Sequence, residues 1–129
     1  MPSKLFEEGM KVRRKILGDA HVDRALANRT AFDTDFQDYV TECCWGPLWT
    51  RPGLDHRTRS LLTLVLLAVL GQEDEFRMHI RASRNTGASP QDIAEALMHV
   101  SVYGGVPAAN HAVRMAKDEF AKLEAAAGA

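Results

Sequence analysis

The sequence has little cysteine, no excess of charge of either sign and no long apolar run. Its 129 residues contain two cysteines, Cys43 and Cys44, which are adjacent and offer neither a disulfide framework nor the spacing of metal ligands. Unpaired cysteines are typical of a reducing compartment, so we expect a cytoplasmic protein. The formal net charge is −1, without the clustered Lys and Arg that nucleic-acid binding requires.

A membrane partner is equally unexpected. The longest apolar run, residues 61–70, is interrupted by Thr63 and falls short of the roughly 20 residues that span a bilayer. Residues 1–17 are charged throughout and contain no apolar signal core. The length predicts a single domain over residues 1–129. A domain of this size buries only about two-thirds of its unfolded surface, which favours a homo-oligomer.

Helix signals dominate the chain, and strand signals are weak. Ser3 and Gly18 bracket a first helix, and residues 19–23 are expected to form a short connection. A second helix is expected from Val22 or Asp23 to Cys44, followed by a rigid loop over residues 45–53. Further helices are expected at about 55–71, 73–85 and 90–103, and from Pro107 through Leu123. The pattern therefore predicts an all-α domain of about six helices.

Two of these helices carry specific signals. The one over 55–71 is apolar around nearly its full circumference and should be central. The one that begins at Pro90 has Ser89 as its N-cap and Asp92 in the acidic place of a capping box.

His79 is the side chain with the clearest chemical potential. Glu75 and Gln72 precede it by four and seven residues, so all three share one helical face. Glu75 and His79 could share a proton, which suits acid–base catalysis near neutral pH. The alternative is a surface Glu–His pair worth a few tenths of a kcal/mol. The two residues supply at most two metal ligands, where zinc needs three or four, and we expect no metal or other cofactor.

Arginines cluster between the tryptophan loop and the apolar helix. Arg51 and Arg59 could clamp a carboxylate in bidentate fashion, or could cap loop carbonyls or pair with Asp55. For Arg57 the structural role is favoured.

Three further residues have two interpretations each. His21 and Arg24 could reach a pocket, from its edge or from a neighbouring subunit, or form local salt bridges at a helix start. Trp45 could wall a pocket for a flat ring, or pin its Pro/Gly loop to the core.

Several segments together resemble the γ-carboxymuconolactone decarboxylase family. Residues 9–14 and 17–24 read GMKVRR and LGDAHVDR, which is similar to the amino-terminal signature of that family. The middle of the family is matched by WG at 45–46, WTRPGL at 49–54 and RTRSL at 57–61. Glu75-x-x-x-His79-x-Arg81-Ala82 and Tyr103-x-Gly105-x-Pro107-Ala108-Ala109-Asn110 complete the resemblance, which extends from about Gly9 to Phe120.

The resemblance implies an alkylhydroperoxidase D-like helical bundle assembled into trimers or hexamers. It implies cofactor-free conversion of 4-carboxymuconolactone, a lactone dicarboxylate, to β-ketoadipate enol-lactone and carbon dioxide, in the protocatechuate branch of the β-ketoadipate pathway. The peroxidase branch of the superfamily carries Cys-x-x-Cys-x-x-x-His. Here Gln72 and Glu75 replace both cysteines, which excludes a disulfide relay.

For the reaction that the resemblance implies, we hypothesise the following roles for the candidate residues. His79 would donate the proton or contact the oxyanion, and Glu75 would tune it. Arg51 and Arg59 would bind carboxylates, with His21 and Arg24 as weaker candidates, and Trp45 would exclude water. Two alternatives stay open: a decarboxylase or isomerase of another carboxylated lactone, and a non-catalytic oligomer that binds a small acid.

Overall fold

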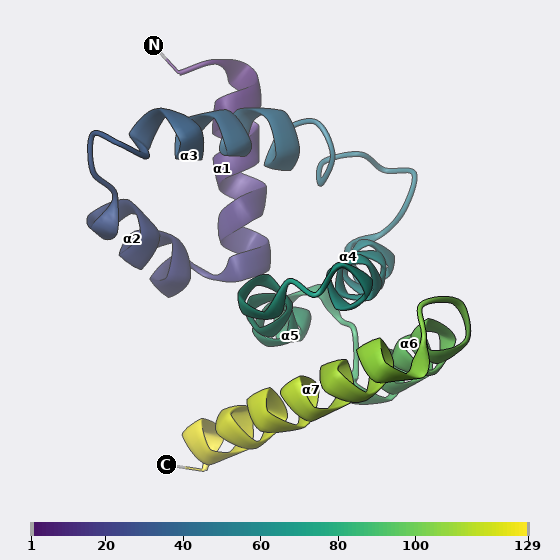
Figure 1. Ribbon diagram of the computed structural model, residues 1–129. Coiled ribbons are helices and arrows are strands. Elements are labelled where there is room, and N and C mark those ends of the chain that lie inside the picture. The colour runs from purple at the N-terminus through teal and green to yellow at the C-terminus, as the bar shows by residue number, and fades with distance from the viewer. Residues whose placement is uncertain (1, 129) are drawn as a thin grey trace. The chain divides into compact units, whose positions relative to one another are not determined.

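The computed structural model describes residues 2–128 of the chain and is helical, with no strand in that range (Figure 1). It contains seven α-helices and one π-helix. The chain divides after Asp55 into two compact units. The all-α prediction is confirmed for these residues, with one helix more than the six expected.

The first unit contains α1 (Lys4–Leu17), α2 (Asp19–Asn28), α3 (Thr34–Val40) and the π-helix η1 (Thr41–Trp45). α1 packs against η1 and α2, and α3 runs directly into η1. Ser3 caps α1 as predicted, because its hydroxyl accepts a hydrogen bond from the Phe6 N–H at 3.1 Å. Gly18, at φ 92°, ends the helix as predicted.

The prediction of one continuous second helix from Val22 or Asp23 to Cys44 is wrong. Helix α2 already begins at Asp19, so residues 19–23 are helical and not a connection. The helix stops where Arg29 adopts an extended backbone (φ −69°, ψ 150°). Beyond it the Asp33 carboxylate accepts from the Thr30 N–H at 2.7 Å, and the Thr34 hydroxyl donates to the Thr30 carbonyl at 2.7 Å. These local bonds give the backbone an alternative to helix, which the hydrophobic periodicity does not register.

Two buried glycines allow α1 to approach η1 closely. A Cβ on Gly9 would lie 2.8 Å from the Gly46 nitrogen and nearer still to the Thr41 carbonyl oxygen. A Cβ on Gly46 would lie 2.5 Å from the Leu5 carbonyl oxygen of α1. Backbone therefore meets backbone here, and there is no room for a side chain on either side.

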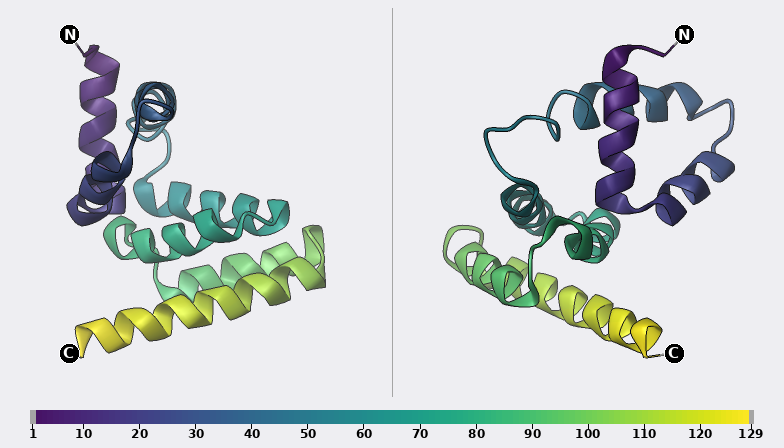
Figure 2. Two further views of the ribbon diagram at one scale, coloured as in Figure 1. Left: turned by 60° about the vertical axis from the view of Figure 1, so that its left-hand side comes forward. Right: turned by 180° about the vertical axis from the view of Figure 1, so that it is seen from behind.

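The second unit is a bundle of four helices, α4 (His56–Leu70), α5 (Glu73–Thr86), α6 (Pro90–Tyr103) and α7 (Val106–Ala127). Consecutive helices form two hairpins, α4 with α5 and α6 with α7, and α5 and α4 also pack on α7 (Figure 2). The capping box of Ser89 and Asp92 is formed as predicted. The core consists of apolar side chains from all four helices: Leu64, Ala68, Phe76, Ile80, Ile93, Leu97, Val100, Ala109, Ala112, Met115 and Ala116.

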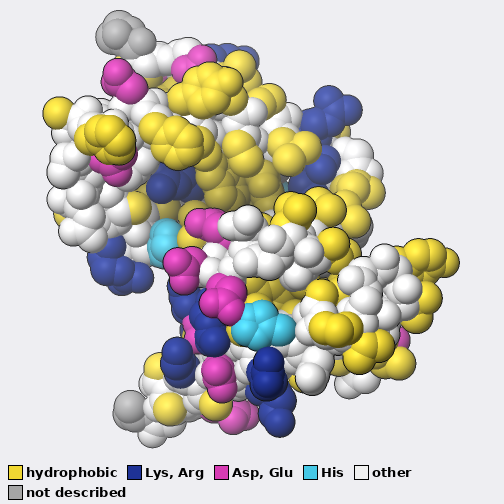
Figure 3. Space-filling model, in the orientation of Figure 1, with side chains coloured by type: hydrophobic (Ala, Val, Ile, Leu, Met, Phe, Trp, Pro, Cys, Tyr) yellow, Lys and Arg dark blue, Asp and Glu magenta, His cyan; other side chains and the backbone are white. Residues whose placement is uncertain are grey.

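Helix α4 is central on one face only. Leu64 and Ala68 are buried in the core, whereas Leu62, Leu66 and Leu70 are exposed. Exposed apolar side chains also gather at the turn between α6 and α7, where Val102, Tyr103 and Val106 lie (Figure 3). The apolar residues on one face of α4 therefore pack in the core, whereas those on the opposite face are exposed in this chain.

Candidate functional site

His79 and Glu75 lie one turn apart on α5, but their environments differ. His79 is only 6% exposed, and its neighbours Phe76 and Ile80 are fully buried. Glu75 is exposed. The alternative of a surface Glu–His pair is therefore wrong for His79, because its imidazole is buried within the second unit. The tuning of His79 by Glu75 stays a prediction.

The two arginines of α4 have separate roles. Arg59 is buried, at 9% exposed. Arg57 is exposed and grips the Asp92 carboxylate with two bonds, Nε to Oδ2 at 2.9 Å and Nη2 to Oδ1 at 2.6 Å. The Arg57 guanidinium, aided by the Ser89 N–H, holds the pKa of the Asp92 carboxyl well below its usual range. This ion pair links the start of α4 to the capping box of α6 and gives Arg57 a structural contact, with a partner other than the loop carbonyls or Asp55 named from the sequence.

The other candidate residues belong to the first unit. Trp45 is buried, and its ring lies 5.2 Å from that of Trp49, which agrees with a role in pinning the loop. His21 is half-buried and Arg24 exposed, both on α2, and Arg51 is exposed beyond η1. At the start of α2, Asp19 and Asp23 pair with Arg14 of α1 at 3.1 and 2.9 Å, and the local salt bridges expected for His21 and Arg24 stay a prediction.

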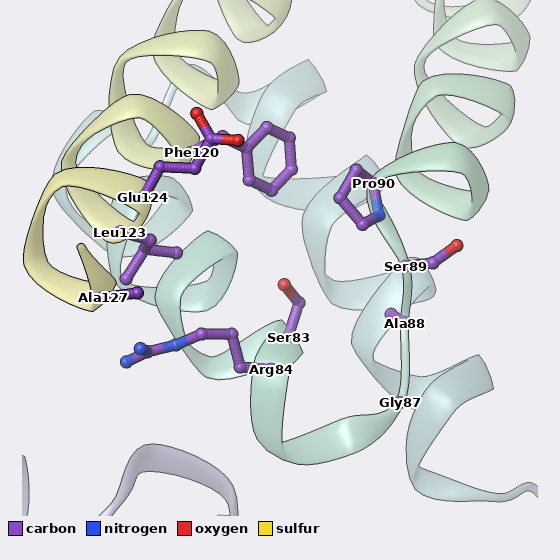
Figure 4. Close-up of a pocket in the computed structure, with 10 residues that line it drawn as sticks. All are labelled: Ser83, Arg84, Gly87, Ala88, Ser89, Pro90, Phe120, Leu123, Glu124 and Ala127. Carbon is purple, nitrogen blue, oxygen red and sulfur yellow. The ribbon is translucent and has the colours of Figure 1, made fainter.

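A pocket of about 530 Å³ opens in the second unit where α5 and α6 meet the end of α7 (Figure 4). Phe120, Leu123 and Pro90 give it apolar walls, and Arg84 and Glu124 lie among its polar lining residues. None of the candidate residues named from the sequence lines it. The pocket therefore adds no support to their assignment.

The sequence pattern missed a buried arginine. Arg13, on α1, is 9% exposed, and its Nη1 donates to the Thr41 hydroxyl at 3.4 Å. Burial, and secondarily the adjacent Arg14, lower the pKa of its guanidinium. The available signal was its spacing, because Arg13 follows Gly9 by four residues and precedes Ile16 by three, which places it on the buried face of α1.

A buried carboxylate was missed as well. Glu119, on α7, is 1% exposed and pairs with Arg81, with Lys122 at 3.2 Å and with Arg77 at 3.8 Å. Figure 3 shows the acidic and basic side chains that interleave over α5 and α7. Since Arg77 and Arg81 belong to α5, this network fixes the helix that carries His79 against α7.

Residues 2–128 contain neither a metal-binding cluster nor a membrane-spanning helix. No group of three or more His, Cys, Asp or Glu side chains there is arranged to hold a metal ion. None of the helices in that range has the length and apolar character needed to cross a membrane.

Comparison with known proteins identifies relatives along most of the chain. Residues 34–118 match the model of the carboxymuconolactone decarboxylase family. A 4-carboxymuconolactone decarboxylase of Acinetobacter baylyi is 44% identical over 118 residues, which cover 92% of this chain and 88% of that protein. A nitrosuccinic acid decarboxylase of Metarhizium robertsii is 45% identical over 106 residues, covering 81% of this chain and 73% of the relative. A 4-carboxymuconolactone decarboxylase of Pseudomonas putida is 46% identical over 41 residues, which cover 32% of this chain and 85% of that protein.

Proposed function

The chain belongs to the carboxymuconolactone decarboxylase family, and we propose that it is a carboxy-lyase that converts 4-carboxymuconolactone to β-ketoadipate enol-lactone and carbon dioxide. The observation that carries this proposal is the 44% identity to the Acinetobacter baylyi enzyme along 92% of the chain. The reaction belongs to the breakdown of protocatechuate through the β-ketoadipate pathway.

The chemistry needs no cofactor as an electron sink. The bond that breaks joins the departing carboxylate to a ring carbon, which is conjugated through the ring double bond to the lactone carbonyl. Its electron pair moves into the ring and leaves a dienolate, whose negative charge rests on the carbonyl oxygen. One proton is then added at the carbon next to that carbonyl, so a dianion and a proton become a monoanion and carbon dioxide. The enzyme has to stabilise the oxyanion and deliver the proton.

We assign these tasks to the residues named from the sequence. His79 delivers the proton or contacts the oxyanion, and its burial supports this role because electrostatic interactions strengthen when water is excluded. Glu75 tunes His79, Arg51 and Arg59 bind carboxylates, His21 and Arg24 assist them, and Trp45 excludes water. The buried position of Arg59 is consistent with a desolvated ion pair to substrate.

The assembly and the setting of the protein are part of the same proposal. The exposed apolar side chains of α4 and of the α6–α7 turn suit an interface between subunits of a homo-oligomer, a trimer or a hexamer. The relationship to the Acinetobacter baylyi protein runs through both units, which supports one domain over residues 1–129. Both cysteines are free thiols, in keeping with a cytoplasmic protein.

Nitrosuccinic acid is a second candidate substrate. The Metarhizium robertsii relative is 45% identical over 81% of this chain, a level that matches the first comparison. Its named substrate carries a nitro group on the carbon that can lose carbon dioxide, and the nitro group accepts the electron pair as a nitronate. Protonation of that carbon completes the reaction, so the same division of tasks applies.

A coupled assay separates the candidates. 4-Carboxymuconolactone is generated in place from β-carboxymuconate by a cycloisomerase, the purified protein is added after treatment with a chelator, and carbon dioxide and enol-lactone are followed. Nitrosuccinic acid is offered in parallel. Release of carbon dioxide from the lactone well above the spontaneous rate is expected. Release only from nitrosuccinic acid would replace the first candidate with the second. No release from either, by a folded protein, would leave a binding role.

The assay also tests His79. His79→Gln is expected to lower kcat by about 10²- to 10⁴-fold, the usual contribution of a positioned acid or base, with KM little changed. His99→Gln is the matched control, because His99 is exposed on α6 and stacks on Tyr103 at 4.9 Å. A His79→Gln variant that turns over at the wild-type rate would remove His79 from the mechanism.

A further inference from the structure

Arg13 is a buried cation with unused hydrogen-bonding capacity. A guanidinium has five N–H donors, and among residues 2–128 the side chain of Arg13 makes one hydrogen bond, from Nη1 to the Thr41 hydroxyl at 3.4 Å. The Thr41 hydroxyl is itself 2.9 Å from the Gln37 carbonyl oxygen, to which it donates, so it can only accept from Arg13. No carboxylate of the described residues lies within ion-pair distance of Arg13, although the residue is 9% exposed.

The Nε–Nη2 edge of the Arg13 guanidinium makes no hydrogen bond among residues 2–128, and this is the edge with which an arginine binds a carboxylate. Arg57 shows this geometry within the same protein, since its Nε and Nη2 hold the two oxygens of Asp92 at 2.9 and 2.6 Å. Arg13 uses Nη1 for Thr41, which leaves the same Nε–Nη2 edge available. Thr41 is 1% exposed and sits at the start of η1, so it holds the guanidinium in one orientation. A planar donor pair held in place is suited to bidentate binding of an anion.

A largely buried charge without a counter-ion is costly to a fold, although the remaining N–H groups of Arg13 are not fully enclosed. Arginine cannot shed its proton to escape that cost, because a guanidinium stays protonated in proteins. The contrast with the adjacent residue is direct: Arg14 pairs with Asp19 and Asp23 at 3.1 and 2.9 Å. A fold that supplies two carboxylates to Arg14 and none to Arg13 leaves Arg13 for an anion from outside the chain.

We propose that Arg13 binds, through Nε and Nη2, the carboxylate that the substrate retains. The proposal rests on the proposed function for its choice of ligand. 4-Carboxymuconolactone and nitrosuccinic acid share a succinate skeleton, in which the carbon that loses carbon dioxide carries a CH₂–COO⁻ group. Only the electron sink differs, a lactone in one and a nitro group in the other. The retained carboxylate keeps its charge throughout the reaction, so a permanent ion pair with it does not hold back the departing group.

The experiment uses succinate as the probe and thermal unfolding of the full chain as the readout. Wild type, Arg13→Met, Arg13→Lys and the control Arg14→Met are compared with and without succinate, and succinate is also tested as a competitive inhibitor of decarboxylation. Succinate is expected to raise the unfolding temperature of wild type and Arg14→Met, to have little effect on Arg13→Lys and none on Arg13→Met. KM of the substrate should rise about 100-fold in Arg13→Met, with kcat little changed.

The unfolding temperature without ligand distinguishes binding from a structural role. Arg13→Met is expected to be as stable as wild type or more so, because an apolar side chain replaces an uncompensated buried charge. A variant that unfolds at a lower temperature yet keeps wild-type affinity for succinate would assign Arg13 to the fold and overturn the proposal. A wild type whose unfolding temperature does not respond to succinate would overturn it too. Failure of the proposed function shows separately, as an absence of carbon dioxide release, and leaves the succinate comparison intact.

Discussion

Replacing Gly9 by alanine tests the close approach of α1 to η1. In an unhindered helix this change would stabilise the protein by about 1 kcal/mol, because alanine loses less conformational freedom than glycine. The Cβ, however, would lie 2.8 Å from the Gly46 nitrogen, and even closer to the Thr41 carbonyl oxygen. Both neighbours are backbone atoms, so no side-chain rotation relieves the overlap.

The clash should outweigh the helix propensity. Restoring ordinary contact requires α1 to withdraw from η1, and overpacking of a well-packed region typically costs about 1–3 kcal/mol. The upper end applies here because backbone meets backbone, which gives a net loss of about 2 kcal/mol after subtraction of about 1 kcal/mol for propensity. For a chain of this size that corresponds to a fall of roughly 8 °C in Tm.

Urea unfolding followed by tryptophan fluorescence is a direct assay, because Trp45 and Trp49 both lie in the first unit. Gly53→Ala is the matched control: nothing lies within 4 Å of the position a Cβ would take there, and we expect a change below about 0.5 kcal/mol. A Gly9→Ala variant as stable as wild type, or more stable, would show that helix propensity wins and that the approach is not as tight as described.

Two further predictions concern charged groups of the second unit. Glu119→Gln should destabilise the protein by about 2 kcal/mol, which is less than the loss of a fully buried pair because Arg77 and Arg81 can rehydrate. Lys122→Gln, which changes the exposed member of the network, should have little effect. Calorimetry measures both changes in stability, and equal effects would contradict the network. Because the pKa of Asp92 is depressed in the folded state, the stability it provides is present above its unfolded pKa and is lost as the pH falls towards the folded value. Wild type should therefore lose more stability than Asp92→Asn between about pH 5 and pH 2, and parallel losses in an acid titration followed by circular dichroism would contradict this.

The helix ends that have strong capping or termination signals were predictable from the sequence. Ser3, Gly18 and the Ser89–Asp92 capping box each fix an end of a helix through bonds between neighbouring residues, and the structure has those ends where they were expected. The break at residues 29–33 was missed because Thr30 and Asp33 form it through side chain to backbone bonds, without the Gly or Pro that usually marks a break. The π-helix at Thr41–Trp45 leaves no periodic signal in so short a segment.

Burial was the least predictable property of the candidate residues. His79 and Glu75 share a helical face by sequence, but only the structure shows that His79 is buried and Glu75 exposed. Arg13 and Glu119 lie at buried positions of amphipathic helices, but their charge made them look like surface residues, so the sequence did not single them out. A charged residue at an apolar position of such a helix is therefore worth the same attention as a histidine in a motif, because the fold has to compensate for it or leave it to a ligand.

The two proposed roles, of Arg13 and of His79, should separate in kinetics for a reason set by the reaction itself. The retained carboxylate has the same charge in substrate, dienolate and product, so a residue that holds it stabilises the ground state and the transition state equally and affects KM. The carbonyl oxygen gains its charge only as carbon dioxide leaves, so a residue that meets that charge or supplies the proton acts on kcat. Arg13→Met and His79→Gln should thus impair the same reaction through different constants. A shared loss of kcat would instead mean that the Arg13 carboxylate contact also aligns the bond that breaks.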